Sequence, residues 1–168
     1  SSRPFPLVLN KTLNIAALVK PKKLDKAHGE GPEFAMVQVP SVLPRIIELP
    51  LRQKTGEHPE RAVILLETVI EQNLYRLFSN YEVLCMSPFR IMRNADFTLD
   101  EEEAQDLLEE ISKQLKKRRR GEVIRLEIED KADKKLIRIL KEELEISNED
   151  IYHIDGPLDL TFLMKMYG

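Results

Sequence analysis

Apolar residues alternate with polar ones in several short stretches of the chain, which is the pattern of half-buried strands. Residues 13–19 form a compact apolar run that predicts a buried strand. Further strands are expected at 34–39, 45–49, 81–92, 122–129 and 150–154. The stretch 81–92 is expected to break at Ser87-Pro88. In 122–129, the pattern places Ile124, Leu126 and Ile128 on one face, and Arg125 and Glu127 on the other.

Other segments repeat their apolar residues every three or four positions, as amphipathic helices do. Helices are expected over 66–78, 98–121, 136–144 and 158–166. The second of these begins with a Thr98–Glu101 capping box and ends at Gly121. Residues 62–65 either open a strand or continue directly into the first helix.

The order of these elements predicts a single α+β domain over residues 1–168, with a mixed β-sheet and helices packed on it. Residues 20–33 and 51–60 are polar and are expected to be exposed loops. The strand at 45–49 lies between two prolines and is expected at a sheet edge, where a missing N–H donor matters least. Its unpaired edge is a candidate interface.

Composition narrows the class of protein. The chain has 168 residues, of which 42% are hydrophobic and 33% charged, with a net charge of -3. A net charge of -3 argues against a protein whose whole surface is built to bind nucleic acid. Cys85 is the only cysteine, so no internal disulfide forms, and a reducing, cytoplasmic location is expected. No apolar run approaches the roughly 20 residues of a transmembrane helix. The abrupt start at Ser1 suggests a piece of a longer chain.

Catalytic and metal-binding patterns are missing from the sequence. No phosphate-binding glycine loop is present, and Gly29-Glu30-Gly31 is too short a match. His28, His58 and His153 are far apart in sequence and lack the spacing of metal ligands. Cys85 lies among apolar residues and is expected to be a buried core residue. We therefore assign no catalytic, cofactor-binding or metal-binding residue.

Two basic features remain. The run 116–120 (Lys-Lys-Arg-Arg-Arg) either binds a polyanion or complements the dipole at a helix C-terminus, and the second interpretation is favoured. Arg90, Arg93 and Asn94 lie where a strand ends before a helix. Alternation puts Arg90 and Arg93 on opposite faces, so Arg90 suits an internal ion pair. Arg93 and Asn94 are candidates for contact with an anion or a neighbouring domain.

A series of motifs in a fixed order resembles the long-chain polyphosphate kinase family, specifically its middle or "head" domain. The motifs lie at residues 3–14, 34–40, 43–50, 66–70, 89–96, 102–108, 119–127 and 156–160. Together they extend over essentially the whole chain. Arg3 stands where that family often has histidine, and Met92 where threonine is usual. The loss of that hydroxyl weakens the case for direct phosphate binding at this turn.

The resemblance implies a parent enzyme that reversibly transfers the terminal phosphate of ATP to polyphosphate, with magnesium, through a phosphohistidine. It implies that this histidine lies in other domains, and that His153 does not replace it. The chain is then an inactive fragment that helps the enzyme dimerise and contacts its remaining domains, with polyphosphate as a further potential partner. Peripheral attachment to the inner membrane is an alternative location for the full enzyme. The rival function is a stand-alone polyanion- or RNA-binding α+β module that uses residues 116–120.

Overall fold

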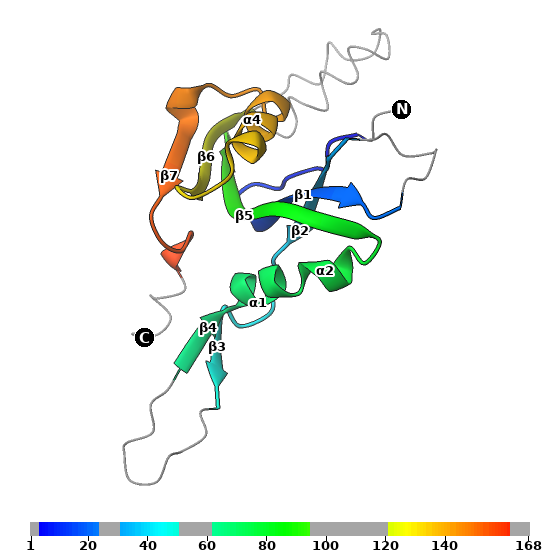
Figure 1. Cartoon of the computed structure of the whole chain (residues 1–168). Coiled ribbons are helices and arrows are strands. Elements are labelled where there is room, and N and C mark those ends of the chain that lie inside the picture. Colours follow the sequence, from blue (N-terminus) through cyan, green and yellow to red (C-terminus); the bar gives the residue numbers. More distant parts are fainter. Residues whose placement is uncertain (1–3, 24–30, 51–61, 95–120, 162–168) are drawn as a thin grey trace, which may run out of the picture.

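The computed structural model describes residues 4–23, 31–50, 62–94 and 121–161 (Figure 1). Its strands are β1 (Leu13–Pro21), β2 (Glu33–Gln38), β3 (Ile46–Leu49), β4 (Ala62–Leu65), β5 (Tyr81–Arg93), β6 (Val123–Glu129) and β7 (Ile151–Ile154). Its helices are α1 (Leu66–Gln72), α2 (Leu74–Leu77), α4 (Lys134–Glu143) and the short 3₁₀ helix η2 (Asn148–Asp150).

Five strands form the main sheet in the order β2-β1-β5-β6-β7. The first three pairings are antiparallel, whereas β6 and β7 are parallel. A parallel pair needs a long crossover connection, and α4 lies within the one between β6 and β7. The prediction of an α+β fold with a mixed sheet is therefore confirmed.

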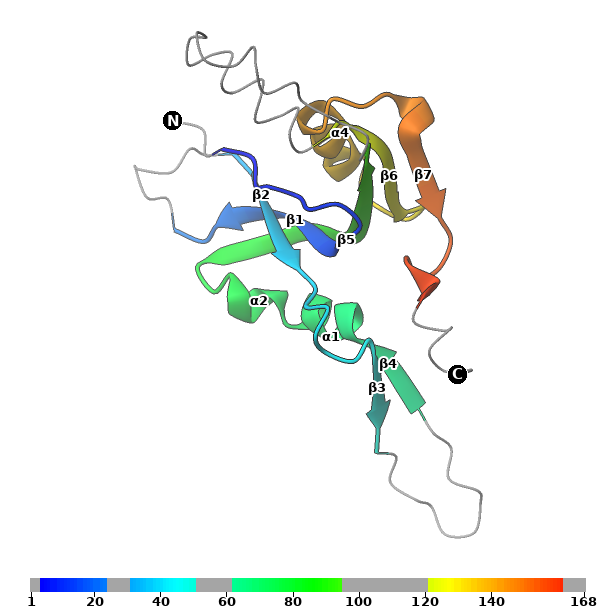
Figure 2. The same cartoon turned by 180° about the vertical axis from the view of Figure 1, so that it is seen from behind.

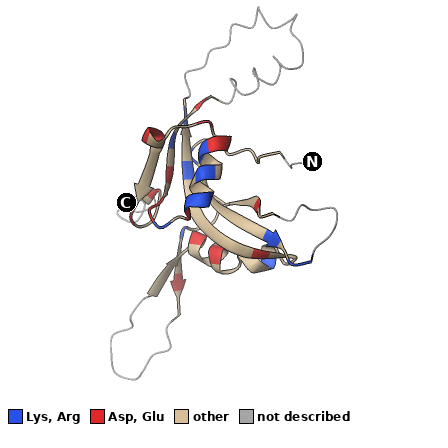
Figure 3. Ribbon diagram, turned by 45° about the horizontal axis from the view of Figure 1, so that its top comes forward, with Lys and Arg blue, Asp and Glu red and all other residues tan. Residues whose placement is uncertain are grey.

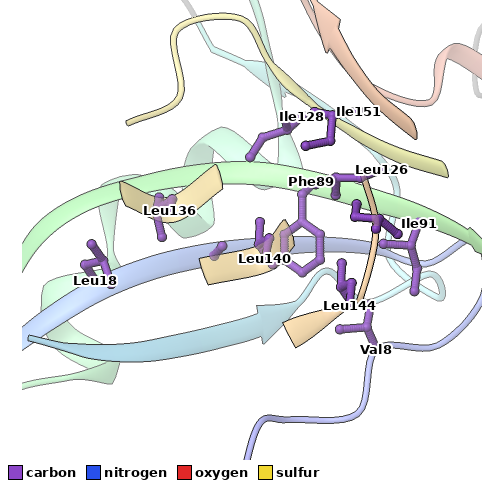
Figure 4. Packing of buried hydrophobic residues seen from close by; sticks show 12 residues of the cluster. Val8, Leu18, Phe89, Ile91, Leu126, Ile128, Leu136, Leu140, Leu144 and Ile151 are labelled. Atoms are coloured by element: carbon purple, nitrogen blue, oxygen red, sulfur yellow. The ribbon is translucent and has the colours of Figure 1, made fainter. Parts of the chain in front are cut away.

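Strand β1 is buried on both faces and supplies two cores. Ala16 and Leu18 face the core beneath α4, which also contains Phe89, Leu136 and Leu140 (Figure 4). The alternate residues of β1 face a second core on the other side of the sheet, with Leu66 of α1, Leu74 of α2 and Leu158: these are Leu13, Ile15, Ala17 and Val19. Helices on both faces explain why the run 13–19 is apolar without alternation.

Helix α4 confirms the expected helix at 136–144, although it begins earlier, at Lys134. The carboxylate of Asp133 caps it by accepting a hydrogen bond from the Lys135 N–H at 2.8 Å. Leu136 and Leu140 are fully buried on its inner face.

Strand β5 is continuous through Pro88, so the expected break at Ser87-Pro88 was wrong. Pro88 pairs with Ile15 of β1, while pairing with β6 begins only at Phe89. The missing N–H of proline is tolerated because β5 has one neighbour at that point.

The irregularities of the sheet lie elsewhere, at two bulges. The register with β1 skips Leu84, and the register with β6 skips Ile124. Both side chains are about half exposed, at 48% and 51%. The prediction that Ile124 lies on one face with Leu126 and Ile128 was therefore wrong, because the bulged residue leaves the alternation.

The helix expected over 66–78 is divided in two at Asn73, whose side-chain amide donates to the Val69 carbonyl at 2.7 Å. A side chain that bonds to the preceding turn competes with the helical ladder. The expected loop at 20–33 is shorter than predicted, because β1 extends to Pro21 and β2 begins at Glu33.

Strands β3 and β4 form a separate two-stranded hairpin that projects away from the main sheet beside α1 (Figures 1 and 2). Ile47 pairs with Ile64 across it and packs against the second core. The short strand at 45–49 is confirmed, and residues 62–65 form a strand that leads directly into α1.

Several predictions fall outside the described residues. These are the helix at 98–121, the loop at 51–60, the basic run at 116–120 and most of the helix at 158–166. Within the described part of the chain, no helix is long and apolar enough to cross a membrane.

Candidate functional site

The Arg45 side chain bridges three parts of the chain. Its Nε and Nη2 donate to the two carboxylate oxygens of Glu67 at 2.8 and 2.6 Å. Its Nη1 and Nη2 also donate to the backbone carbonyls of Asp159 and Leu158. We call these four groups the Arg45 cluster. It joins the base of the β3–β4 hairpin, the first turn of α1 and the segment after β7.

The Arg45 cluster is buried, since its two charged side chains are only 14% and 5% exposed. The planar guanidinium suits this role because it presents parallel donors to both carboxylate oxygens. Asp159 has φ of 48°, in the left-handed region. Burial alone would raise the pKa of Asp159, but the Thr161 hydrogen bond and the charges of Arg90 and Arg45 lower it.

The Arg93 side chain forms a second such cluster at the end of β5. Its guanidinium donates to the Val8 carbonyl through Nε and Nη2, at 3.2 and 2.8 Å, and to the Gly121 carbonyl through Nη1 at 3.0 Å. Its backbone N–H donates to the Asn10 side chain at 2.8 Å. We call these groups the Arg93 cluster. It holds the segment before β1 against the segment that enters β6.

Gly121 is confined by the same arrangement. Its φ is 77°, and a Cβ atom built on it would lie 2.1 Å from the Asn94 carbonyl oxygen. Next to it, the Asn94 N–H donates to the Glu122 carbonyl at 2.8 Å. Only glycine fits both the backbone conformation and the close approach of the two segments.

Charged side chains also lie on the face of β5 and β6 opposite α4. Arg90 Nη1 lies 3.6 Å from Glu127 Oε2, and Arg125 Nε lies 3.0 Å from Glu127 Oε1. The Arg125–Glu127 contact is an ion pair but not a hydrogen bond, because the Arg125 Nε has no hydrogen-bond partner of suitable geometry among the described residues. The Arg125 guanidinium stacks 3.8 Å above the Tyr152 ring. The positive charges of Arg90 and Arg125 are therefore partly balanced within the domain, by the carboxylate of Glu127.

Two carboxylates, those of Glu71 on α1 and Glu129 at the end of β6, have raised pKa values. Burial raises the pKa of Glu71 to about 7, and the negative charges of Glu129 and Glu67 add to the shift. Burial likewise raises the pKa of Glu129, against the nearby Lys131 charge. The described residues contain no cluster suited to holding a metal ion.

A cavity of about 440 Å³ borders the Arg45 cluster. Leu13, Val39 and Leu66 supply apolar lining, while Lys11 and Asp159 bring opposite charges to it. Arg45 also lines it, but its charge is matched by Glu67. The cavity thus has no surplus of positive charge that would select an anion.

The predicted site residues do not converge on one ligand position. Arg90 takes part in the ion pair that its strand position suggested. Arg93 contacts internal carbonyls, and Asn94 is exposed beside it. Contact of these residues with an anion or another domain stays a prediction. Sequence reasoning missed the Arg45–Glu67 pair, which is separated by 22 positions and carries no local spacing signal.

The other candidates are also placed by the structure. His153 is exposed on the edge strand β7. Cys85 is only half-buried rather than fully buried, and burial raises the pKa of its thiol. Neither residue belongs to the Arg45 or Arg93 cluster.

Comparisons with known proteins agree with the family resemblance. The family model for the polyphosphate kinase middle domain matches residues 1–166. The polyphosphate kinase of Halalkalibacterium halodurans is 48% identical over 99% of this chain and 22% of its own length. Bacillus anthracis polyphosphate kinase is 45% identical over 98% of this chain and 23% of its own length. Polyphosphate kinase 1 of Chlorobaculum tepidum is 38% identical over 99% of this chain and 23% of its own length.

The fold is also shared with a solved protein. The crystal structure of polyphosphate kinase from Porphyromonas gingivalis matches with a TM-score of 0.67 at 22% identity, over 95% of this chain and 20% of that chain. The chain thus spans little more than a fifth of the relatives that it matches. With the family model matching almost the whole chain, we conclude that it belongs to the polyphosphate kinase middle-domain family.

Proposed function

We propose that this chain is the structural and interaction module of a longer polyphosphate kinase. The parent enzyme reversibly transfers the terminal phosphate of ATP to polyphosphate through a phosphohistidine. ATP, magnesium and the phosphorylated histidine belong to its other domains. The names of the relatives and the small share of their length that this chain spans support the proposal.

One observation carries the proposal: Arg45 and Arg93 both bind backbone carbonyls of the domain itself. Arg45 and Arg93 direct guanidinium donors at carbonyls of segments remote in sequence, rather than into an open site. The described residues also include no cluster with metal-ligand geometry. This organisation supports a role in positioning chain segments for contacts.

The β3–β4 hairpin is the contact surface that the geometry favours for dimerisation of the parent enzyme. A two-stranded hairpin is marginally stable alone in water and gains stability by packing. This one projects from the body (Figure 2). It exposes Leu49 and Val63, at 43% and 59%. It pairs with no third strand among the described elements. A second copy of the enzyme would cover both the apolar side chains and the open strand edge.

The experiment places a charge on this surface in the full enzyme. Val63→Glu is chosen because Val63 is exposed, whereas Ile46 and Ile47 are half-buried and their substitution would disturb the domain itself. Light scattering should show a dimer for the wild type and a loss of dimer for Val63→Glu. The matched control is Tyr75→Glu on α2, an exposed side chain on the body that should leave the mass unchanged. An unchanged dimer in Val63→Glu would count against the hairpin as the interface.

Arg90, Arg93 and Asn94 remain proposed contacts with an anion or with a neighbouring domain of the same enzyme. The exposed position of Asn94 next to the Arg93 cluster favours a neighbouring domain.

A further inference from the structure

The outward face of α4 carries four cations on a protein with a net charge of -3. Figure 3 shows basic residues following one another along this helix. Lys134, Lys135 and Arg138 are exposed and Lys141 is half-buried, while Leu136 and Leu140 point into the core. The only acidic residues of α4 are Glu142 and Glu143, at its last positions. The helix therefore carries a net charge of +2, from four cations and two carboxylates.

The positions of Lys134 and Lys135 do not serve the stability of the helix. The N-terminus of a helix carries a partial positive charge that favours acidic side chains by about 0.3–1 kcal/mol each. The first turn of α4 contains Lys134 and Lys135 and no acidic residue. Their charges oppose the helix dipole, so a solvated, stabilising helix face is a poor explanation for them.

None of these cations forms an ion pair within the described part of the chain. The ion pairs there involve Arg45, Arg90 and Arg125, and none includes a cation of α4. The charges of α4 are therefore available to a partner.

Lys134, Arg138 and Lys141 recur at intervals of four and three residues, which places them on one side of the helix. The row extends for about 10 Å along the helix axis. We propose that this row, which we call the α4 basic row, binds the linear polyanion polyphosphate. The inference rests on the proposed function for the identity of the polyanion, and on the charge pattern of α4 for its position.

The test is a titration of labelled polyphosphate with the chain, followed by fluorescence anisotropy at about 50 mM and about 200 mM salt. The variant Lys134→Gln/Arg138→Gln/Lys141→Gln removes the row. The matched control, Lys20→Gln/Lys22→Gln/Lys23→Gln, removes three exposed cations near the end of β1. We expect the α4 variant to lose about tenfold or more in affinity at low salt, with a shallower salt dependence, and the control to lose less than about threefold.

The variant should remain folded, because Lys134 and Arg138 are exposed and Lys141 is half-buried, while the fully buried residues Leu136 and Leu140 are unchanged. Equal affinity losses in the two triple variants, or none in the α4 variant, would overturn the proposal. Equally tight binding of an RNA oligomer of the same charge would overturn polyphosphate as the specific ligand. Neither result bears on dimerisation through the hairpin, which the light-scattering experiment tests separately.

Discussion

Arg45 and Glu67 form a buried, two-pronged ion pair that unites segments which the sequence keeps far apart. The two hydrogen bonds measure 2.8 and 2.6 Å, and Glu67 is 4% exposed. The same guanidinium holds the carbonyls of Leu158 and Asp159. Such a pair contributes more to a unique arrangement than to net stability, because desolvation of the charges offsets their attraction.

Removal of one partner of this pair should be costly. We expect Arg45→Ala to lower the free energy of unfolding by about 3–5 kcal/mol, because the Glu67 carboxylate would remain buried and unpaired. The double variant Arg45→Met/Glu67→Met replaces both charges with apolar side chains and should recover most of that loss. Guanidinium denaturation measures both. A double variant as unstable as Arg45→Ala would contradict the ion-pair explanation.

The close approach of the Asn94 carbonyl to Gly121 predicts that no side chain is tolerated at position 121. Gly121→Ala should lower the free energy of unfolding by about 1–3 kcal/mol, because the positive φ strains alanine and its Cβ meets the Asn94 carbonyl. Gly31→Ala is the control, since nothing lies within 4 Å of a Cβ there. Its effect should stay within about 0.5 kcal/mol. Thermal unfolding of both variants checks the difference, and equal shifts would exclude the clash as its cause.

The raised pKa of Glu71 predicts that stability falls as the pH rises. The pKa is about 7 in the folded chain against 4.5 as its ordinary value. Between pH 4.5 and 7 the folded chain retains a proton on Glu71 that the unfolded chain has released. The contribution of Glu71 to the free energy of unfolding is therefore complete below pH 4.5, and it is lost as the pH rises through 7. Urea denaturation of wild type and Glu71→Gln should show the wild type losing stability relative to the variant between about pH 5 and pH 8.

The control for this comparison is Glu142→Gln on α4, which removes an exposed carboxylate. It should follow the wild-type pH dependence. If Glu71→Gln also follows it, the burial of Glu71 beside Glu67 and Glu129 does not control its protonation.

Arg93 should matter for stability because its guanidinium fastens two chain segments. Arg93→Met would leave the Val8 and Gly121 carbonyls without this donor, and we expect a loss of about 2–3 kcal/mol in urea denaturation. Arg76→Met is the control: Arg76 is exposed, and among the described residues its side chain bonds to the neighbouring Tyr75 alone. A similar small effect in both variants would mean that the Arg93 contacts are replaced by water at no cost.

Local periodicity predicted most described elements because burial imposes it. The run 13–19, buried between two cores, and the apolar stripe of α4 are examples. The exceptions arose where a side chain or a neighbouring strand overruled the local pattern. Asn73 interrupts the helix by bonding to Val69, and the bulge at Ile124 turns an apolar residue outward. The first reflects the low helix propensity of asparagine, whereas the second is set by pairing with β5.

The candidate site was less predictable for a different reason. Arg90, Arg93 and Gly121 stood out locally, whereas Arg45 and Glu67 lie in separate motifs with no sign of contact. Their pairing follows from the packing of the hairpin base on α1 and the return of the chain after β7. Long-range contacts of this kind are set by tertiary packing, which no local period records.

We propose that this domain contributes contacts, and no phosphoryl-transfer chemistry, to its parent enzyme. The most direct test incubates the purified chain with ATP, magnesium and a polyphosphate primer, after circular dichroism has confirmed folding of the same sample. The measurement is the transfer of terminal phosphate from labelled ATP into polyphosphate. We predict no transfer above a control without protein, and transfer that increases in proportion to the concentration of the chain would contradict the claim.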